Sequence, residues 1–288
     1  MKLLIILLII FFVAAFLVIV ESIRECRLLA ATVYEIDTKG VFSSENPVKI
    51  AVLADLHNSL LKDGERIIDA VRKERPDFII LAGDMLLSHS DQRRENKKTA
   101  ELINGLCDIA PLFYGMGNHE TAVSNREYLK HLWPDFLNNL TNKEALLRNS
   151  SKNIYVKGKK INIYGLELPE KYYKRFNKLK PTGEEIDNLI GKIDNSAYNI
   201  LIAHNPDFFK QYTEWGADLI LSGHNHGGMV RLPFFGGVIS PRPAIFPKYD
   251  YGLFQNEDAI MIVSGGMGSH TIKIRLNNKP ELVIVKLR

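Results

Sequence analysis

The 288-residue sequence contains only two cysteines, Cys26 and Cys107. Two cysteines cannot form a disulfide framework, and these two do not have the spacing of a cysteine metal site. The excess of one sign of charge is also small, because 37 basic and 33 acidic residues leave a net charge of +4. No dense basic block alternates with aromatic residues, so the composition gives no indication of a nucleic-acid partner.

Several catalytic motifs are missing as well. The sequence has no HExxH motif, which disfavours a metal-dependent amidase or peptidase, and no evident serine or cysteine nucleophile motif. It also lacks internal repeats and low-complexity segments. With 46% apolar and 24% charged residues, the chain has the composition of an ordinary globular protein.

One long hydrophobic run is present near the N-terminus. Leu3 to Val20 is an unbroken apolar stretch of eighteen residues, which as a helix spans about 27 Å, close to the thickness of a bilayer. Because no small-x-small exit follows it, we expect an uncleaved single-pass anchor in the cell membrane, with a cleaved signal peptide as the alternative. Lys2 before the run and Arg24 and Arg27 after it favour a cytoplasmic domain but leave the opposite orientation open.

The rest of the chain alternates between strand and helix patterns. Buried strands are expected at 48–55, 78–84, 111–120, 161–168, 198–206 and 217–226, and helices at 64–75, 91–109, 123–132 and 184–193. Residues 170–185 are expected to form a loop, and strands are expected at 229–234, 259–266, 271–276 and 281–287. This alternation predicts an α/β fold. We divide the chain into an anchor at 1–22, a connector with a first strand at 23–46, and one large domain at 47–288.

Polar side chains follow five of these strands. They are Asp55 and His57 in DLH, Asp84 in GD, Asn118 and His119 in GNHE, His204 in AHNPD, and His224 and His226 in GHNH. Any one of these motifs alone is more often ordinary surface polarity. Because the carboxyl ends of strands in an open α/β sheet meet at one crevice, the five together predict a single site.

The types of these side chains indicate metal binding. Two carboxylates, four imidazoles and one amide are too many ligands for one tetrahedral ion. They suit two divalent ions, Mn, Zn, Fe or Ni, that share a bridging carboxylate. With a bridging hydroxide the site would carry a net charge of about +1, which attracts a phosphate group.

Glycines flank the expected ligands at positions 83, 117, 223, 227 and 228. Such glycines let the backbone turn sharply and come close to the site. His224 and His226 are two residues apart, so an extended backbone would place both side chains on the same side.

The ordered set DLH, GD, GNHE, AHNPD and GHNHGG resembles the calcineurin-like metallophosphoesterase superfamily. The resemblance implies a four-layer αββα sandwich in which two mixed sheets are flanked by helices. An anchor placed before this domain is similar to the membrane-associated bacterial branch. Some members of that branch act on phosphodiesters, including a nucleotide-lipid pyrophosphate.

The resemblance also implies roles for individual residues. One metal would be held by Asp55, His57 and His226, with Asp84 as the bridge to the other. The second metal would be held by Asp84 together with Asn118, His204 and His224. His119 would be the catalytic residue rather than a ligand, acting as a general acid or as a stabiliser of the transition state.

The expected function is that of a membrane-anchored phosphodiesterase or pyrophosphatase, with attack by a hydroxide that bridges the two metals. A lipid-linked phosphodiester or pyrophosphate is the first substrate expected, and wall polymers or nucleotide-type phosphoesters come second. The apolar stretch 232–247 would form a membrane-facing lip or simply pack. A catalytically silent, metal-stabilised scaffold at the membrane is the alternative function.

Two positions depart from the family's usual pattern. Asn225 stands where threonine is common, and Met229 stands where glutamine is common, at the expected rim of the substrate site. Neither departure removes a ligand. His89, His131 and His270 lie outside the motifs, so we expect structural or surface roles for them.

Overall fold

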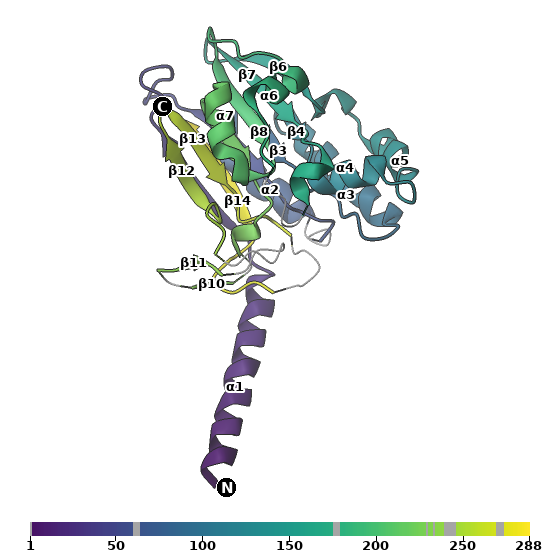
Figure 1. Cartoon of the computed structure of the whole chain (residues 1–288), viewed down its shortest axis with the longest axis vertical. Coiled ribbons are helices and arrows are strands. Elements are labelled where there is room, and N and C mark those ends of the chain that lie inside the picture. Colours follow the sequence, from purple (N-terminus) through teal and green to yellow (C-terminus); the bar gives the residue numbers. More distant parts are fainter. Residues whose placement is uncertain are drawn as a thin grey trace.

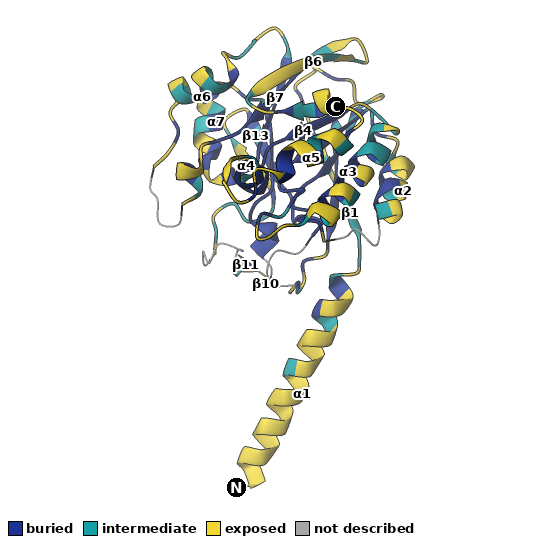
Figure 2. Cartoon of the chain, turned by 90° about the vertical axis from the view of Figure 1, so that its right-hand side faces the viewer, coloured by how far each residue is buried: buried dark blue, intermediate teal, exposed yellow. Residues whose placement is uncertain are grey.

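The computed structural model describes residues 2–59, 64–174, 179–228, 230–232, 234–238, 246–268 and 274–288. Its first element is helix α1 (Lys2–Glu25), which extends away from the folded domain (Figure 1). The helix is long and apolar enough to cross a membrane, and none of its most apolar stretch is buried. Figure 2 shows it exposed along most of its length, and only its last turns contact the domain.

The first sheet contains six strands. In spatial order they are β1 (Ala30–Ile36), β14 (Glu281–Leu287), β2 (Val48–Leu53), β3 (Phe78–Ala82), β4 (Leu112–Gly115) and β5 (Leu146–Leu147). The four strands from β2 to β5 run parallel, whereas β14 is antiparallel to β2 and parallel to β1. The carboxyl ends of β2, β3 and β4 therefore meet at one edge of the sheet.

The second sheet also contains six strands. In spatial order they are β12 (Gly252–Asn256), β13 (Ala259–Val263), β9 (Leu219–Ser222), β8 (Tyr198–Ala203), β7 (Lys159–Leu166) and β6 (Ser150–Val156). The four central strands are parallel, and the two edge strands are antiparallel to their neighbours. A separate small hairpin pairs β10 (Arg231–Leu232) with β11 (Gly236–Gly237).

Helices cover the outer face of each sheet. Those packed on the first sheet are α2 (Gly64–Glu74), α3 (Arg93–Cys107) and α5 (Leu132–Asn139), and those on the second are α6 (Gly183–Ile190) and α7 (Phe209–Trp215). A further helix, α4 (Asn118–Asn125), follows β4, and short 3-10 turns lie at Lys143–Ala145, Glu170–Tyr173, Pro206–Phe208 and His226–Gly228. The fold is thus the four-layer αββα sandwich with two mixed sheets that the family resemblance implies.

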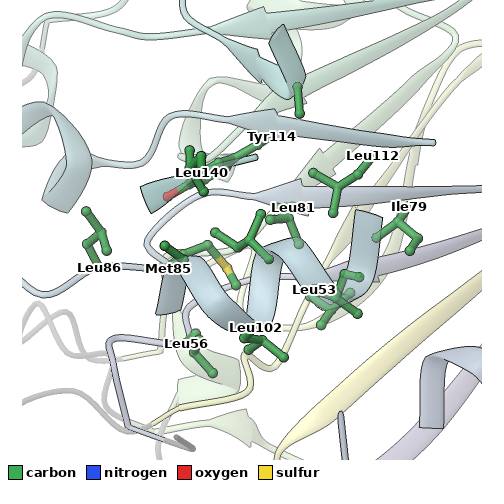
Figure 3. Packing of buried hydrophobic residues seen from close by; sticks show 14 of the residues in the cluster. Leu53, Leu56, Ile79, Leu81, Met85, Leu86, Leu102, Leu112, Tyr114 and Leu140 are labelled. Atoms are coloured by element: carbon green, nitrogen blue, oxygen red, sulfur yellow. The ribbon is translucent and has the colours of Figure 1, made fainter. Parts of the chain in front are cut away.

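Alternation along the strands creates three apolar cores. In β2, Ile50 and Val52 face the second sheet, whereas Ala51 and Leu53 face the helices. Figure 3 shows part of the core under the helices, where Leu53, Leu81 and Leu102 pack together. The core between the sheets holds the two halves of the molecule against each other.

Some of the predicted elements are absent from the described residues or shorter than predicted. The strand expected at 111–120 ends at Gly115, and GNHE begins α4, so there is no single helix over 123–132. The Glu120 side chain accepts the Gly117 N–H at 2.9 Å, which caps this helix at its start.

Other differences have similarly local causes. The helix expected at 184–193 ends at Ile190, because Gly191 has a φ of 83°. The expected loop at 170–185 contains the turn Glu170–Tyr173, and α6 already begins within it. Of the strand expected at 229–234, β10 covers two residues, and residues 271–273 lie outside the described part of the chain.

Candidate metal centre

Both sheets supply the predicted site residues. Asp55 and His57 follow β2, Asp84 follows β3, and Asn118 and His119 begin α4 directly after β4. From the second sheet, His204 follows β8, and His224 and His226 follow β9. All of these side chains are buried except that of Asn118, which is partly buried. The structure therefore brings every predicted site residue to the same end of the two sheets.

One group of possible ligands combines Asp55, His57 and His226, whose ligand atoms lie within 4.8 Å of one another. The His226 Nε2 atom is 3.4 Å from Asp55 Oδ1, and the Nε2 atoms of His57 and His226 are 2.8 Å apart. The two imidazole rings are stacked, with centroids 4.8 Å apart. A carboxylate and two imidazoles in this arrangement are a ligand set that suits a divalent transition metal.

A second group combines Asp84, His204 and His224, again with ligand atoms within 4.8 Å of one another. The His204 Nε2 atom is 3.0 Å from Asp84 Oδ2. The same Asp84 oxygen is 3.9 Å from His57 Nε2, so Asp84 lies beside both groups. One carboxylate in this position could bridge two ions.

Buried polar atoms within the site fit a bound cation. The Asn118 Oδ1 atom is buried and forms no hydrogen bond with the described residues, and the buried His204 Nε2 atom lies against the Asp84 carboxylate. On its other side, His204 Nδ1 donates to the Ala82 carbonyl at 2.8 Å, which directs Nε2 into the site. Since buried polar atoms almost always have a partner, these ligand atoms fit a bound metal.

The backbone around the ligands adopts conformations that are uncommon for residues other than glycine. Asp55, His57, Asp84, His224 and His226 all have φ between 49° and 75°. Such strain tends to concentrate at functional sites. It also corrects the extended backbone expected for the two histidines after β9. The backbone at His224 and His226 lies in the left-handed region and does not alternate as a strand does. The two histidines reach different groups because the chain turns between them.

Two of the flanking glycines are required by close approach. A Cβ atom on Gly117 would overlap the Asp84 carboxylate, and one on Gly223 would overlap the Asp55 carboxylate. The prediction that glycines let the backbone come close to the site is confirmed at these positions.

Charges of opposite sign within the site balance one another. Burial raises the pKa values of Asp55 and Asp84, but the surrounding histidines outweigh burial and hold both pKa values below the ordinary range. Burial likewise lowers the pKa of His204, but Asp84 and Asp55 outweigh it and raise that pKa to about 9. Two buried carboxylates that remain ionised are suited to holding cations.

Glu120 organises the loops that carry the ligands, although the sequence reasoning gave it no role. Its fully buried carboxylate accepts hydrogen bonds from Tyr114 Oη and from the backbone N–H groups of Asp84, Leu86 and Gly117, all at 2.8–2.9 Å. Its place three residues after Gly117, the residue that caps α4, is the signal in the sequence that could have identified it. Glu120 thus fixes the turn after β3 against the start of α4.

Ser88 fixes the orientation of His119. The Ser88 backbone N–H donates to His119 Nδ1 at 2.9 Å, and Ser88 Oγ lies at the same distance from that nitrogen. Because a backbone N–H can only donate, Nδ1 must be the acceptor, and the proton of a neutral ring is on Nε2. His119 Nε2 lies 4.0 Å from Asp84 Oδ2, so this proton faces the candidate metal centre. No motif in the sequence indicated Ser88.

The turn that carries His226 is supported from behind. The Asn278 side chain donates to the His226 carbonyl at 2.6 Å. The neighbouring Arg275 is buried, and its guanidinium donates to the carbonyl groups of Gly265, Gly266 and Gly268. The segment 265–268 packs against Asp55, because the Gly268 N–H donates to the Asp55 carbonyl at 2.8 Å. No motif in the sequence predicted these contacts.

The histidines outside the motifs and the two departures from the family pattern have different surroundings. The imidazole ring of His89 lies 5.4 Å from that of His119, nearer to the site than expected. His131 is 3.6 Å from Asp91 on the surface, as expected. Asn225 donates to the Tyr249 carbonyl at 2.8 Å and so has a structural contact. Met229 and His270 lie outside the described residues.

Comparison with known proteins agrees with this geometry. The sequence profile of the calcineurin-like phosphoesterase family matches residues 48–228, which include every predicted ligand. The chain belongs to this family. It is accordingly a metal-dependent phosphoester hydrolase with an α/β metallophosphatase fold.

Several relatives of this phosphoesterase are known. The uncharacterized metallophosphoesterase YkuE of Bacillus subtilis (strain 168) is 24% identical over 92% of this chain and 87% of its own length. Phosphodiesterase YaeI of Escherichia coli (strain K12) is 28% identical over 84% of this chain and 82% of its own length. Among solved structures, the NAD nucleotidase NadN of Haemophilus influenzae has a TM-score of 0.49 and 15% identity over 77% of this chain and 45% of its own.

Proposed function

We propose that this phosphoesterase is a membrane-anchored, two-metal phosphodiesterase or pyrophosphatase that acts on a lipid-linked phosphoester, with nucleotide-type phosphoesters as the second substrate class. The observation that carries the proposal is the pair of Asp/His groups with Asp84 beside both. In this proposal, residues 1–22 are the anchor, 23–46 a connector with the first strand, and 47–288 the catalytic domain.

The proposed ligands follow from the two groups. Asp55, His57 and His226 would hold one divalent ion, Asp84 would bridge to the other, and Asn118, His204 and His224 would complete the second set. When bound, such ions polarise phosphoryl oxygens and lower the pKa of a coordinated water towards neutrality. We propose that the two ions are drawn from Mn, Zn, Fe and Ni.

His119 would act on the substrate rather than on the metals. With Nδ1 engaged by Ser88, its Nε2 proton is available to donate to the oxygen of a leaving group. Its backbone N–H donates to Asp84 Oδ1 at 2.8 Å, so the same residue also holds the bridging carboxylate in place. This pairing supports a catalytic role for the ring and a positioning role for the backbone.

Helix α1 supports the membrane assignment. Its apolar surface is exposed, and a single span of this kind would hold the domain at the membrane surface, on one side of the bilayer or the other. A catalytic domain held there meets lipid-linked phosphoesters at a much higher local concentration than dissolved ones.

A catalytically silent scaffold at the membrane is the alternative. It would still need the ligand backbone to hold its metal, but it would have no need for the two Ser88 contacts that fix His119. These contacts favour the enzyme.

The test measures activity and metal content on the same full-length sample in detergent micelles. The substrates are bis-p-nitrophenyl phosphate, p-nitrophenyl phosphate, a nucleoside diphosphate sugar, a phospholipid and a lipid-linked pyrophosphate. We expect about two divalent ions per chain and the highest kcat/KM for a lipid-linked substrate. Substitution His119→Asn should lower kcat by roughly 10²–10⁴-fold with both metals retained.

His131→Asn is the matched control, because it removes an exposed imidazole from the surface. It should change neither quantity. The enzyme proposal is overturned if metal-loaded protein hydrolyses none of the substrates. The lipid-linked assignment is overturned if water-soluble substrates have an equal or higher kcat/KM.

A further inference from the structure

An apolar surface lies next to the end of α1. It consists of residues 230–232 and 234–238, which include β10 and β11, together with Phe246; we name it the docking hairpin. Phe234 is fully exposed and Phe235 is 72% exposed, and Leu232 and Phe246 are exposed as well. Phe246 belongs to the same surface because its N–H donates to the Val238 carbonyl at 3.1 Å. Two neighbouring phenylalanines so fully exposed are unusual on a protein surrounded only by water.

Hydrogen bonds attach the docking hairpin to the last turn of α1 through residues 275–278. On one side, the Arg275 N–H donates to Ser22 Oγ and the Asn278 N–H donates to the Glu25 carboxylate, both at 3.0 Å. On the other side, the Arg231 N–H donates to the Leu276 carbonyl at 2.9 Å. Figures 1 and 2 both show β10 and β11 at the end of the domain from which α1 emerges.

Further exposed apolar residues lie in the same region. Ile23, in the last turns of α1, and Ile274, beside Arg275, are 49% and 43% exposed. A bilayer crossed by α1 would begin close to these residues. Aromatic and aliphatic side chains that lie against a membrane surface bury their apolar area among the headgroups and upper acyl chains.

The docking hairpin is also attached to the candidate metal centre. Arg231 is paired with Asp250 at 2.8 Å, and its guanidinium donates to the Gly227 carbonyl at 2.8 Å. Gly227 directly follows His226, and Asn278 supports the His226 carbonyl. The hairpin and the ligand turn are therefore held as one unit, and the position of one determines that of the other.

We propose that the docking hairpin inserts Phe234 and Phe235 into the lipid bilayer beside α1 and so holds the metal centre at the level of the lipid headgroups. This inference rests on the proposed membrane anchoring and deepens it. A single helix leaves the domain free to tilt and rotate, whereas a second contact with the bilayer fixes its orientation. A lipid-linked phosphoester could then reach the site without leaving the membrane.

The test uses the full-length chain reconstituted in phosphatidylcholine vesicles with or without bromine on the acyl chains. A Phe234→Trp variant reports contact with the acyl chains, because bromine quenches indole fluorescence at short range. The native Trp133 and Trp215 are buried in the domain, and the spectrum of the parent protein is subtracted. We expect the emission of the introduced tryptophan to fall about twofold in brominated vesicles.

The control is Tyr155→Trp. Tyr155 is 74% exposed on β6, and both views show β6 at the end of the domain opposite α1 (Figures 1 and 2). Its emission should be the same in both kinds of vesicle.

Flotation separates the possible failures. If the chain floats with the vesicles but the tryptophan at 234 is quenched no more than that at 155, the docking proposal is overturned and the anchor stands. If that unquenched tryptophan is also shielded from acrylamide, a second copy of the chain covers the surface instead. If the chain does not float with the vesicles, the anchor and the docking proposal are both wrong.

Discussion

The two sheets contribute different chemistry to the same site. The first sheet supplies both carboxylates and the amide, from Asp55, Asp84 and Asn118, and one imidazole from His57. The second sheet supplies imidazoles alone, from His204, His224 and His226. Each of the two proposed ligand groups includes residues from both sheets, although a further grouping, His57, Asp84 and His119, comes from the first sheet alone. The proposed pair of ion sites therefore exists only where the sheets pack together.

The largest expected effect comes from removing the carboxylate that lies beside both groups. We expect Asp84→Asn to lose both ions and to lower kcat/KM by about 10³-fold, which corresponds to about 4 kcal/mol. His224→Asn, on the second sheet, should lose one ion and retain the other. Metal content by mass spectrometry and hydrolysis of bis-p-nitrophenyl phosphate measure both effects.

Asp258→Asn is a suitable control, because Asp258 is exposed and pairs with Lys39 on the surface. Equal metal content in Asp84→Asn and His224→Asn would show that the first sheet does not supply a bridging ligand.

The sequence predicted the fold class and the convergence of the site residues, because both depend on local patterns. Nearly continuous apolar runs identify strands, such as the run 48–55 that contains β2 (Val48–Leu53), and polar residues directly after parallel strands must meet. The helix at GNHE was missed although Gly117 and Glu120 have the spacing of a helix cap, and the hydrogen bonds that Glu120 accepts from the turn after β3 are tertiary. Ser88, Arg275 and Asn278 were missed for the same reason, as they act through backbone groups distant in the sequence.

Substitutions in the core between the sheets test whether the candidate metal centre depends on the contact between the two sheets. Ile202 on β8 is buried between the sheets and lies against Gly115 on β4. Ile103 on α3 is equally buried but lies between the first sheet and its helices. We expect Ile202→Ala and Ile103→Ala each to cost about 2–5 kcal/mol of unfolding free energy in urea titrations.

Only Ile202→Ala should also weaken metal binding, because it loosens the contact between the two ligand sets. An equal loss of metal affinity in Ile103→Ala would mean that general destabilisation, and not the sheet–sheet contact, controls the site.

Metal itself should join the two sheets. Because each proposed ion takes ligands from both, binding should stabilise the folded domain by about 3 kcal/mol when free metal is at 100 times its Kd. Thermal unfolding in detergent, with Mn²⁺ or Zn²⁺ against a chelator, measures this difference. In Asp84→Asn the stabilisation should disappear. A chelator that leaves the Tm of the parent protein unchanged would contradict the idea that metal links the sheets.

The smallest expected effect concerns Ser88, which belongs to the first-sheet side of the site and touches no proposed ligand directly. In Ser88→Ala the backbone N–H still donates to His119 Nδ1, and only the second contact, from Oγ, is lost. We therefore expect kcat to fall about fivefold, as for the loss of one ordinary hydrogen bond, with KM and metal content unchanged. Ser88→Thr, which keeps the hydroxyl, should restore most of the rate. If Ser88 acts by orienting His119, Ser88→Ala should have no further effect in a His119→Asn background. A full fivefold loss in that background would show that Ser88 acts on the reaction by another route.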